Sequence, residues 1–552
     1  MATVSVRPPR TGRGVELGLL LLALVLSLGA YAQVGLATTG AVPPGLAVHG
    51  GGLALLALVV HLLIRWRAPY ADPVLLPIVV ALNGIGLSMI YRIDQAAGEG
   101  GSSSADRQLL WTLVGVAAAV AVLWFVRDHR LLRRYTYTAM VAGLVLLLLP
   151  LVPGLGVNLN GARIWIHLGS MSFQPAELGK ILLAVFFAGY LVTNRDNLAL
   201  AGPRILGLHL PRLRDLGPIL LAWGVSLAVL VLERDLGTSL LFFGLFVAML
   251  YVATERLSWV LIGLLLFGGG AALAAQLFPH VGARVEVWLH ALEPEVYSRS
   301  PGGSGQVVQG LFGLASGGLL GTGWGEGYPQ LVPYANSDFI VASLGEELGL
   351  TGLLALLLLY LVLAERGLRA AIGVRDGFGK LLASGLAFVL AFQCFVVVGG
   401  VTRLIPLTGL TMPFLALGGS SLLSNWVIVA LLLRISDAAR RPAPPAALLQ
   451  PEPGELAVVG GPNGAGRDRA AGDGLGDDRP TEVRAGAADG WDDVGRTRGD
   501  GGRTGRSDRD DGGHRGRPGS GGRSGGPGPG PGAAPGRDGG PEDGQPTEVV
   551  RL

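Results

Sequence analysis

The chain has 552 residues, of which 50% are hydrophobic and only 15% are charged. Soluble domains carry about 25% charged residues, so this composition excludes an ordinary soluble enzyme and predicts an all-α polytopic membrane protein. The formal net charge of +3 is too small to indicate a nucleic-acid partner. The single cysteine, Cys394, lies in an apolar run and excludes a disulfide framework.

Apolar runs fill most of the chain between residues 15 and 436. A spanning helix needs about 20 mostly apolar residues, and twelve stretches meet this requirement. The first is uniformly apolar and is a poor match to a cleavage pattern, so we interpret it as a retained helix. The predicted spans lie near residues 15–35, 47–64, 73–91, 109–126, 136–153, 174–193, 216–232, 237–253, 258–278, 339–364, 379–400 and 412–434.

Arginine and lysine residues gather in the connections on one side of the predicted bundle. Positively charged loops stay in the cytoplasm, so we expect a multi-pass cell-membrane protein with both termini cytoplasmic. The connection 279–338 is then extracytoplasmic. Long connections of this kind are usually functional or disordered, and its segment "GLFGLASGGLLG" argues for order.

Four polar clusters interrupt the apolar background, and all four fall at or near the expected outer face. They are "NLNGARIWIHLGSMSFQPAELGK", "ERDLGTS", the region 279–349 and "TRLIPLTGLTMPFLALGGSSLLSNW". Charged groups at membrane depth normally face a bundle interior or an aqueous cavity. The clusters therefore predict a site at this face.

The charged residues of these clusters have more than one interpretation. Glu177 and Lys180 are three residues apart on one helix and can pair, either to lock helices together or to take part in function. Asp338 precedes the tenth span, where it is either an N-cap or a functional acid. Capping does not account for Glu346 and Glu347, one to two turns deeper in the apolar segment.

Three arginines lie on the expected outer side against the orientation bias: Arg163, Arg284 and Arg403. Any one of them fits a headgroup anchor, whereas three near one cavity fit a lipid pyrophosphate, because arginine contacts phosphate bidentately. The glycines of "SGGLLGTGWGEG" lack the spacing of a nucleotide loop, so no nucleotide is expected. The histidines lack a metal-ligand spacing.

The polar clusters resemble motifs of the SEDS family, the RodA/FtsW/SpoVE group of bacterial cell-wall proteins. "NGARIWIHLGSMSFQPAELGK", "DLGTS", "GLASGGLLGTG", "SDFIVASLGEELG" and "IPLTGLTMPFLALGGSS" follow in the family's order. The resemblance implies a ten-helix core at 72–436, with the large outer loop 279–338. Residues 1–14 are then a cytoplasmic segment, and 15–71 form two additional helices, similar to actinobacterial RodA-type proteins.

The resemblance implies that the protein polymerises lipid II into glycan strands. Lipid II is an undecaprenyl-pyrophosphate-linked disaccharide pentapeptide. The resemblance also implies that a class B penicillin-binding protein is the partner in this work. Asp338 matches the family's essential acid, and Glu177 and Lys180 match its intramembrane pair. Gln306 and Ser316 join the three arginines as candidate substrate contacts. The other residues in matching motifs are Trp165, Gln174, Asp235, Thr238, Glu346, Glu347, Pro406, Thr408, Gly418, Gly419, Ser420 and Ser421.

The sequence departs from the family pattern at two places. Glu233 and Arg234 replace the usual Gln-Pro before "DLGT", and Ala416-Leu417 replaces the usual Ser-Tyr before "GGSS". Neither departure touches Asp338. They affect the expected lining of the cavity more than the chemistry.

The implied chemistry is an inverting glycosyl transfer, in which Asp338 accepts the proton of the attacking sugar hydroxyl. The departing pyrophosphate needs a counter-charge, which the three arginines or a divalent cation (Mg²⁺ or Mn²⁺) would supply. The additional N-terminal helices favour a role in cell elongation over a division-specific FtsW-type role. Two readings of other classes stay open: a lipid II flippase or transporter, and a scaffold that activates the transpeptidase.

The last segment, residues 437–552, is rich in glycine, proline, arginine and aspartate, which predicts a disordered cytoplasmic tail. It repeats a short word, "RPTEVR" and "QPTEVVRL", which places Thr481 and Thr547 in similar settings. The repeat is either drift in a biased composition or a pair of phosphorylation sites that dock a phosphothreonine-binding protein.

Overall fold

The computed structural model describes residues 11–98, 103–159, 162–168, 171–199, 204–205, 208–209, 217–300 and 302–442. The predictions for the tail, including Thr481 and Thr547, and those for the first ten residues lie outside the described residues. Within the described part, eleven helices are long and apolar enough to cross a membrane. The prediction of an all-α polytopic membrane protein is confirmed.

The long helices follow the predicted apolar runs. The seventh run forms a helix of 16 residues, or about 24 Å at 1.5 Å per residue, and is not among the eleven. The helices are α1 (Arg13–Thr39), α2 (Leu46–Arg67), α3 (Leu75–Ala96), α4 (Ser103–Phe125), α5 (Thr136–Leu148), α6 (Pro175–Ala199), α7 (Gly217–Leu232), α8 (Leu236–Thr254), α9 (Leu257–Leu277), α13 (Ile340–Gly373), α14 (Gly377–Val401) and α15 (Gly419–Arg440). Two 3-10 helices, η1 (His129–Tyr135) and η2 (Leu149–Leu151), extend α5.

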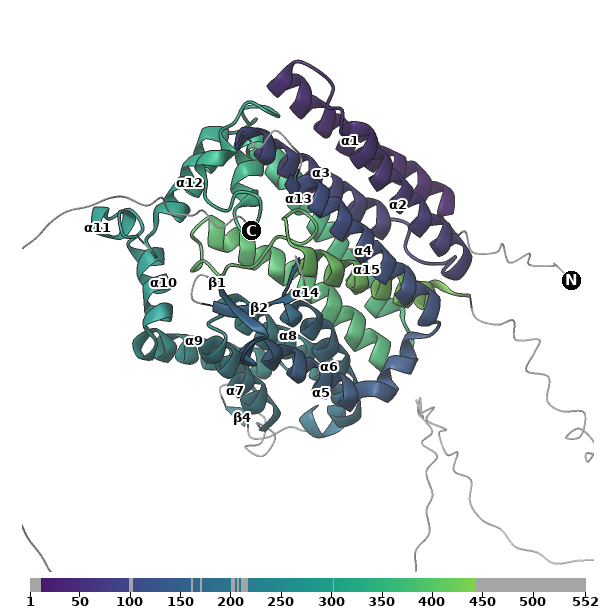
Figure 1. The fold of residues 1–552 in the computed structure, drawn as a ribbon. Helices are drawn as coiled ribbons and strands as arrows, with labels where there is room; N and C mark the ends of the chain where they lie inside the picture. Colours follow the sequence, from purple (N-terminus) through teal and green to yellow (C-terminus); the bar gives the residue numbers. More distant parts are fainter. Residues whose placement is uncertain are drawn as a thin grey trace, which may run out of the picture. The chain divides into compact units, whose positions relative to one another are not determined.

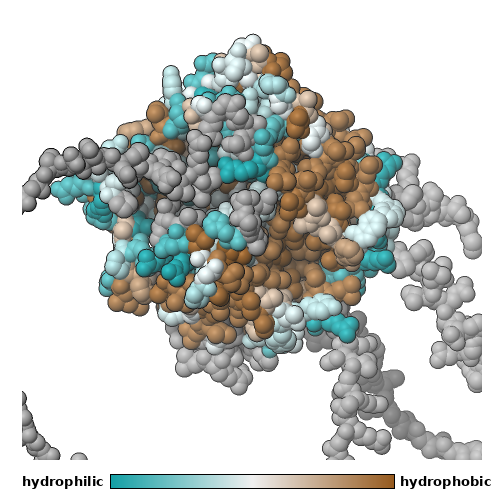
Figure 2. All heavy atoms as spheres, in the orientation of Figure 1, coloured by the Kyte–Doolittle hydropathy of each residue, from teal (hydrophilic) through white to brown (hydrophobic). Residues whose placement is uncertain are grey.

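Helix α3 lies in the interior of the bundle. In Figure 1, α1 and α2 run beside α3 and α4, with which they pack. Helix α3 also contacts α13 and α15, and 94% of its most apolar window is buried. On the face shown in Figure 2, hydrophobic side chains form a broad area over α1, α2 and α4, which carry many exposed apolar residues, as expected for a surface in contact with lipid.

Five short strands complete the described structure. β1 (Gly156–Leu159), β2 (Ala162–Leu168) and β3 (Met171–Phe173) form an antiparallel sheet between α5 and α6, in which Trp165 pairs with Val157. β4 (Arg204–Ile205) and β5 (Leu208–His209) form a second antiparallel pair. The sequence analysis did not predict these strands.

The connection between α9 and α13 contains ordered structure, as predicted. It holds α10 (Pro279–Leu289), α11 (Pro294–Tyr297), α12 (Gly305–Gly317) and the 3-10 helix η4 (Pro329–Leu331). We call the end of the bundle that carries this connection the loop end.

Helix α13 is broken near the loop end. Its 34 residues would span about 51 Å as a continuous helix, well over the bilayer core of about 30 Å. Gly349 adopts φ 68° and ψ −176°, a conformation that glycine tolerates and other residues rarely adopt. The break separates a half-helix, residues 340–348, from residues 350–373.

The segment 318–323 lies in this break and satisfies its backbone groups. Two N–H groups of the segment donate to the carbonyl oxygens of Glu346 and Glu347, each over 3.0 Å. Two of its carbonyl oxygens accept from the N–H groups of Leu350 and Thr351, over 3.0 and 3.1 Å. Since free helix ends need such partners, the segment fixes the half-helix relative to the spanning part.

Glycines allow α12 to approach the half-helix closely. A Cβ at Gly310 would lie 2.6 Å from the Phe339 ring, and one at Gly317 would lie 2.1 Å from the Gly345 carbonyl oxygen. Any side chain at these positions would separate the two helices.

A glycine substitution in α3 tests the packing of the core. A Cβ at Gly86 would lie 2.4 Å from the Leu415 carbonyl oxygen, so Gly86→Ala is expected to displace backbone and to lower stability by about 1–3 kcal/mol. Thermal unfolding of the purified protein measures this loss. The control is Gly18→Ala, on exposed α1 surface with no atom within 4 Å; equal melting temperatures for the two variants would contradict the packing.

Candidate active site

Asp338 lies two residues before α13 and is half-buried. The N-cap of α13 is Phe339, and no side chain caps the helix. The N-cap interpretation of Asp338 is therefore wrong. The chain enters α13 through a turn in which the N–H groups of Ser337 and Phe339 donate to the Tyr334 carbonyl oxygen, which leaves the Asp338 carboxylate free of the helix.

The Asp338 carboxylate faces the connection between α14 and α15. A Cβ added at Gly409 would lie 3.7 Å from Asp338 Oδ2, and Gly409 has φ 75°, which favours glycine. Asp338 has no hydrogen bond or ion pair with the residues the structure describes. Its oxygens are thus available to a substrate.

Arg284 supplies positive charge beside this carboxylate. It lies on α10, and its Nη1 donates to the carbonyl oxygens of Leu407 and Thr408 over 3.1 and 3.2 Å. One turn further, Trp288 Nε1 donates to the Arg403 carbonyl oxygen over 3.1 Å. These bonds hold α10 against the α14–α15 connection.

The surroundings raise the basicity of Asp338. Burial raises the pKa of its carboxyl group to about 6, while the charge of Arg284 opposes the rise and that of Asp235 adds to it. An aspartate with this pKa is mostly ionised at neutral pH and accepts a proton more readily than one in water. These properties suit a general base.

Asp235 has a structural role at the start of α8. As N-cap it accepts hydrogen bonds from the Thr238 N–H (2.9 Å) and the Thr238 hydroxyl (2.5 Å). Gln174 Nε2 donates to it over 3.4 Å. Burial raises the pKa of Asp235, and its bonds to Thr238 oppose that rise. The structure thus brings together three of the predicted motif residues.

Glu233 lies beside this cluster and is buried. Burial, followed by the nearby charge of Asp235, raises the pKa of Glu233 to about 8. Its carbonyl oxygen accepts from the Arg163 N–H over 3.3 Å, which joins β2 to the turn between α7 and α8. The Arg163 side chain is exposed and does not line the cavity described next.

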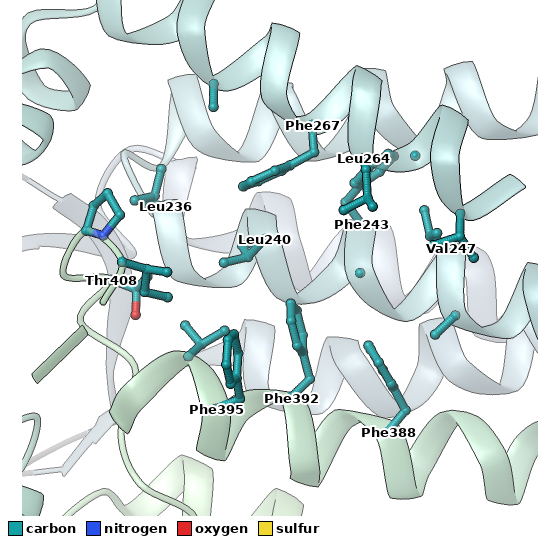
Figure 3. A pocket seen from close by; sticks show the side chains of 18 of the residues that line it. Leu236, Leu240, Phe243, Val247, Leu264, Phe267, Phe388, Phe392, Phe395 and Thr408 are labelled. Carbon is teal, nitrogen blue, oxygen red and sulfur yellow. The ribbon is translucent and has the colours of Figure 1, made fainter. Parts of the chain in front are cut away.

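A cavity of about 980 Å³ runs between α8, α9, α10 and α14. In Figure 3, Phe388, Phe392 and Phe395 project from α14 toward Leu240 and Phe243 of α8, and Thr408 lies at one end. Arg284, Trp288 and Pro406 also line it. The lining is otherwise almost entirely apolar, so the cavity suits a long hydrocarbon chain whose polar end lies near Arg284.

Three other predicted substrate contacts do not line this cavity. Arg403 is half-buried next to it, where its backbone binds Trp288. Gln306 and Ser316 lie on α12; Gln306 is half-buried, and Ser316 is exposed and donates to the Gly313 carbonyl oxygen of its own helix. Of the predicted arginines, the structure brings Arg284 alone to both Asp338 and the cavity.

The pair of Glu177 and Lys180 forms in a buried polar network. Lys180 Nζ lies 2.5 Å from Glu177 Oε2 and donates to Gln393 Oε1 (3.0 Å) and Asn425 Oδ1 (3.3 Å). Ser424 Oγ donates to Glu177 Oε2 over 2.8 Å. The network joins α6, α14 and α15, which accords with the helix-locking interpretation.

The "GGSS" motif begins α15. Gly418 is its N-cap, and a Cβ at Gly419 would lie 2.0 Å from the Trp111 ring. Ser420 and Ser421 are buried, and Ser421 Oγ accepts from Asn425 Nδ2 over 3.2 Å. These residues pack α15 and join it to the Lys180 network.

Glu346 and Glu347 lie in the half-helix rather than in the spanning part of α13. Glu347 Oε1 accepts from Arg92 Nε over 2.8 Å, and its Oε2 accepts from the Gly325 N–H over 3.0 Å. Glu346 Oε1 accepts from the Tyr328 N–H over 2.9 Å. Both acids therefore hold the loop segment 325–328.

Sequence reasoning missed the partners of these acids. Arg92 lies near the end of α3, and nothing in its local sequence indicates a partner 255 positions away. Gln393 and Asn425 gave no local signal, because a polar residue in an apolar run does not reveal its partner. The only local sign of the break in α13 is the glycine at position 349. Among the described residues, no three His, Cys, Asp or Glu side chains cluster to hold a metal ion.

Comparisons with known proteins agree with this geometry. Residues 73–441 match the FtsW/RodA/SpoVE family, described as cell cycle proteins. The chain is 51% identical over 447 residues to "Peptidoglycan glycosyltransferase RodA" of Mycobacterium tuberculosis, covering 80% of this chain and 94% of that one. It is 34% identical over 377 residues to "Stage V sporulation protein E" of Bacillus subtilis, covering 67% and 98%.

A solved structure described as "Structural coordination of polymerization and crosslinking by a peptidoglycan synthase complex" has the same fold. Its TM-score is 0.54 at 26% identity, with 67% of this chain and 99% of that chain covered. The match over most of the chain, together with the polar motifs at the loop end, leads to one conclusion. The chain belongs to the FtsW/RodA/SpoVE family, also called the SEDS family.

Proposed function

We propose that this protein is a peptidoglycan glycosyltransferase that polymerises lipid II into glycan strands. The observation that carries the proposal is the position of Asp338, a carboxylate that has no hydrogen bond or ion pair with any described residue and lies near the polar end of a large apolar cavity. The relatives at 50–51% identity bear the name of this activity. The almost entirely apolar lining of the cavity suits the prenyl chain of such a substrate.

In the proposed reaction, Asp338 accepts the proton of the acceptor sugar's 4-hydroxyl as that oxygen bonds to the anomeric carbon of the donor. The bond between this carbon and the pyrophosphate oxygen breaks at the same time, so the configuration inverts. Arg284 stabilises the charge that develops on the departing pyrophosphate. The proposal assigns the counter-charge to Arg284 and routes no step through a divalent cation.

The proposed biological role is elongation of the cell wall. Relatives named RodA are 50–51% identical to this chain, whereas an FtsW relative from Trichlorobacter lovleyi is 33% identical. We place the loop end outside the cell and both termini in the cytoplasm, because arginines gather at the opposite ends of the helices. A class B penicillin-binding protein is the proposed partner, since a structural relative belongs to a synthase complex.

Transport is the competing function, because broken helices near the membrane midplane are typical of transporters. Here the break at Gly349 follows nine residues of α13 and lies toward its loop end. It is also filled by the segment 318–323. This position favours an enzyme with a site at one face over a carrier with a site at mid-depth.

Replacing the proposed base should abolish polymerisation. Asp338→Asn keeps the shape of the side chain but removes proton acceptance, so the rate should fall about 10²- to 10⁴-fold. The measurement is glycan-strand formation from labelled lipid II by the full-length protein in liposomes, with and without its penicillin-binding partner. The control is Ser337→Ala, and wild-type polymer from Asp338→Asn would exclude this role.

The pH profile should report the ionisation of Asp338. Since the ionised form is the active one and its pKa is about 6, the rate should be half-maximal near pH 6 and fall about tenfold per unit at lower pH. Arg284 lowers this pKa, so Arg284→Gln should move the acidic limb to higher pH. Initial polymerisation rates measured from about one pH unit below this pKa to about two units above it report both effects.

Arg299→Gln is the matched control for the charge change. Arg299 lies on the same connection, but it is exposed and pairs with Glu286 over 2.8 Å. Its removal should leave the acidic limb in place. An equal shift for both arginine variants would mean that general surface charge sets the profile, and not the proximity of Arg284.

We also propose that Thr481 and Thr547 of the tail are phosphorylated and bind a phosphothreonine-binding protein. The support is their repeated sequence context and the charge and acceptor oxygens that phosphate would add. Mass spectrometry of the tail from growing cells should find phosphate on one or both threonines. Unmodified threonines throughout growth would exclude this regulation.

A further inference from the structure

The two N-terminal helices precede the family match, which begins at residue 73, so the reaction proposed above gives them no role. Helix α1 nevertheless reaches the loop end, close to the half-helix that follows Asp338. Three links join α1 to this half-helix.

The first link is the contact between α1 and Gly325. A Cβ at Gly325 would lie 2.6 Å from Ala37 Cβ and 3.5 Å from the Val34 carbonyl oxygen. Gly325 has φ 91°, a conformation suited to glycine. The last turns of α1 therefore lie directly against the backbone of this loop residue.

The second link runs from Gly325 to the half-helix. The Gly325 N–H donates to Glu347 Oε2 over 3.0 Å, and Arg92 Nε donates to the other oxygen of Glu347 over 2.8 Å. Arg92 Nη2 also donates to the Gly327 carbonyl oxygen over 2.6 Å. The loop backbone and Arg92 together hold Glu347, which is buried.

The third link joins α1 to the helix that carries Arg92. Tyr31 of α1 stacks on Tyr91 of α3, with ring centroids 4.3 Å apart. Ser88 of α3 donates to the Ser27 carbonyl oxygen over 3.1 Å. Helix α1 thus supports both the loop and the arginine that bind Glu347.

Helix α1 is also fixed at its opposite end, as a rigid support requires. Arg13 and Glu16 form a buried ion pair, and His61 of α2 lies 2.7 Å from Glu16 Oε1 through its Nδ1. Arg13 Nη2 donates to the Ala71 carbonyl oxygen at the start of the core. Movement of α1 along the bundle would break this buried network, which is costly.

We propose that α1 is a brace that positions the half-helix 340–348, and with it Asp338, through Gly325 and Glu347. The catalytic consequence rests on the function proposed above. Ala37 is then a positioning residue that acts on Asp338 from another helix, and the Val34 side chain packs the same turn of α1 into the core. Small displacements of a reacting group lower the rate strongly without removing substrate contacts.

The test compares Ala37→Phe with Leu36→Phe in the full-length protein. Both residues are exposed on α1, but of the two only Ala37 is among the nearest neighbours of a Cβ at Gly325. Ala37→Phe should displace the loop, increase amide hydrogen exchange at 340–348 about tenfold or more, and lower kcat for lipid II about 10- to 100-fold with little change in KM. Leu36→Phe should change neither measurement.

A second pair of variants covers the case in which Ala37→Phe does not fold. Val34→Ala trims a buried residue of the same turn, and Val25→Ala trims an exposed residue of the same helix. The first should loosen residues 340–348 and the second should not. Wild-type exchange in both Ala37→Phe and Val34→Ala, or an equal rise along the whole bundle, would overturn the brace.

The two readouts separate failure of the brace from failure of the proposed function. Hydrogen exchange tests the brace even if the wild-type protein makes no polymer, in which case the glycosyltransferase proposal fails alone. If the wild type is active and the variants match it in exchange and kcat, the brace fails alone. Normal exchange with reduced kcat would also overturn it, because the effect would then reach Asp338 by another route.

Discussion

A carboxylate among apolar helices is stable only when a cation or a hydrogen-bond donor faces it, and this constraint organises the described structure. Glu177 lies against Lys180 and Ser424, and Glu347 lies between Arg92 and a backbone N–H. These pairs join helices that are far apart in the sequence. Asp338 differs, because Arg284 acts on it without a direct bond.

The contrast between paired and unpaired acids separates structural from chemical roles. An acid held by several donors is a poor proton acceptor, because its oxygens are already occupied. Asp338 keeps both oxygens available next to the bare backbone of Gly409, and its surroundings raise its pKa. The nearby pairs make the site rigid, so that the free carboxylate has a defined position.

Much of the fold follows from local pattern. Apolar runs predicted the helices, and the spacing of Glu177 and Lys180 predicted their pair, because both depend on short-range periodicity. The sequence predicted that the outer connection is ordered, but it did not predict the helices α10, α11 and α12 within it. The sheet β1 to β3 was missed, since its short strands lie in a glycine-rich polar segment without clear alternation.

The candidate site was predictable in its residue types but not in its arrangement. Asp338 and Arg284 were both singled out, yet nothing local distinguishes Arg284 from Arg163, which is exposed in β2. The capping interpretation of Asp338 was wrong because a turn places Phe339 at the helix start. Tertiary contacts decide which arginine lies near Asp338 and whether Asp338 caps the helix. Such contacts cannot be predicted from a single sequence.

The break at Gly349 also determines which residues of α13 belong to its spanning part. A charged residue at the centre of a membrane helix costs about 2.5–3.5 kcal/mol on the translocon scale. Because the chain turns at Gly349, Glu346 and Glu347 precede the leucine-rich stretch 350–373 and do not lie within it. The spanning part of α13 therefore does not carry the cost of these two carboxylates.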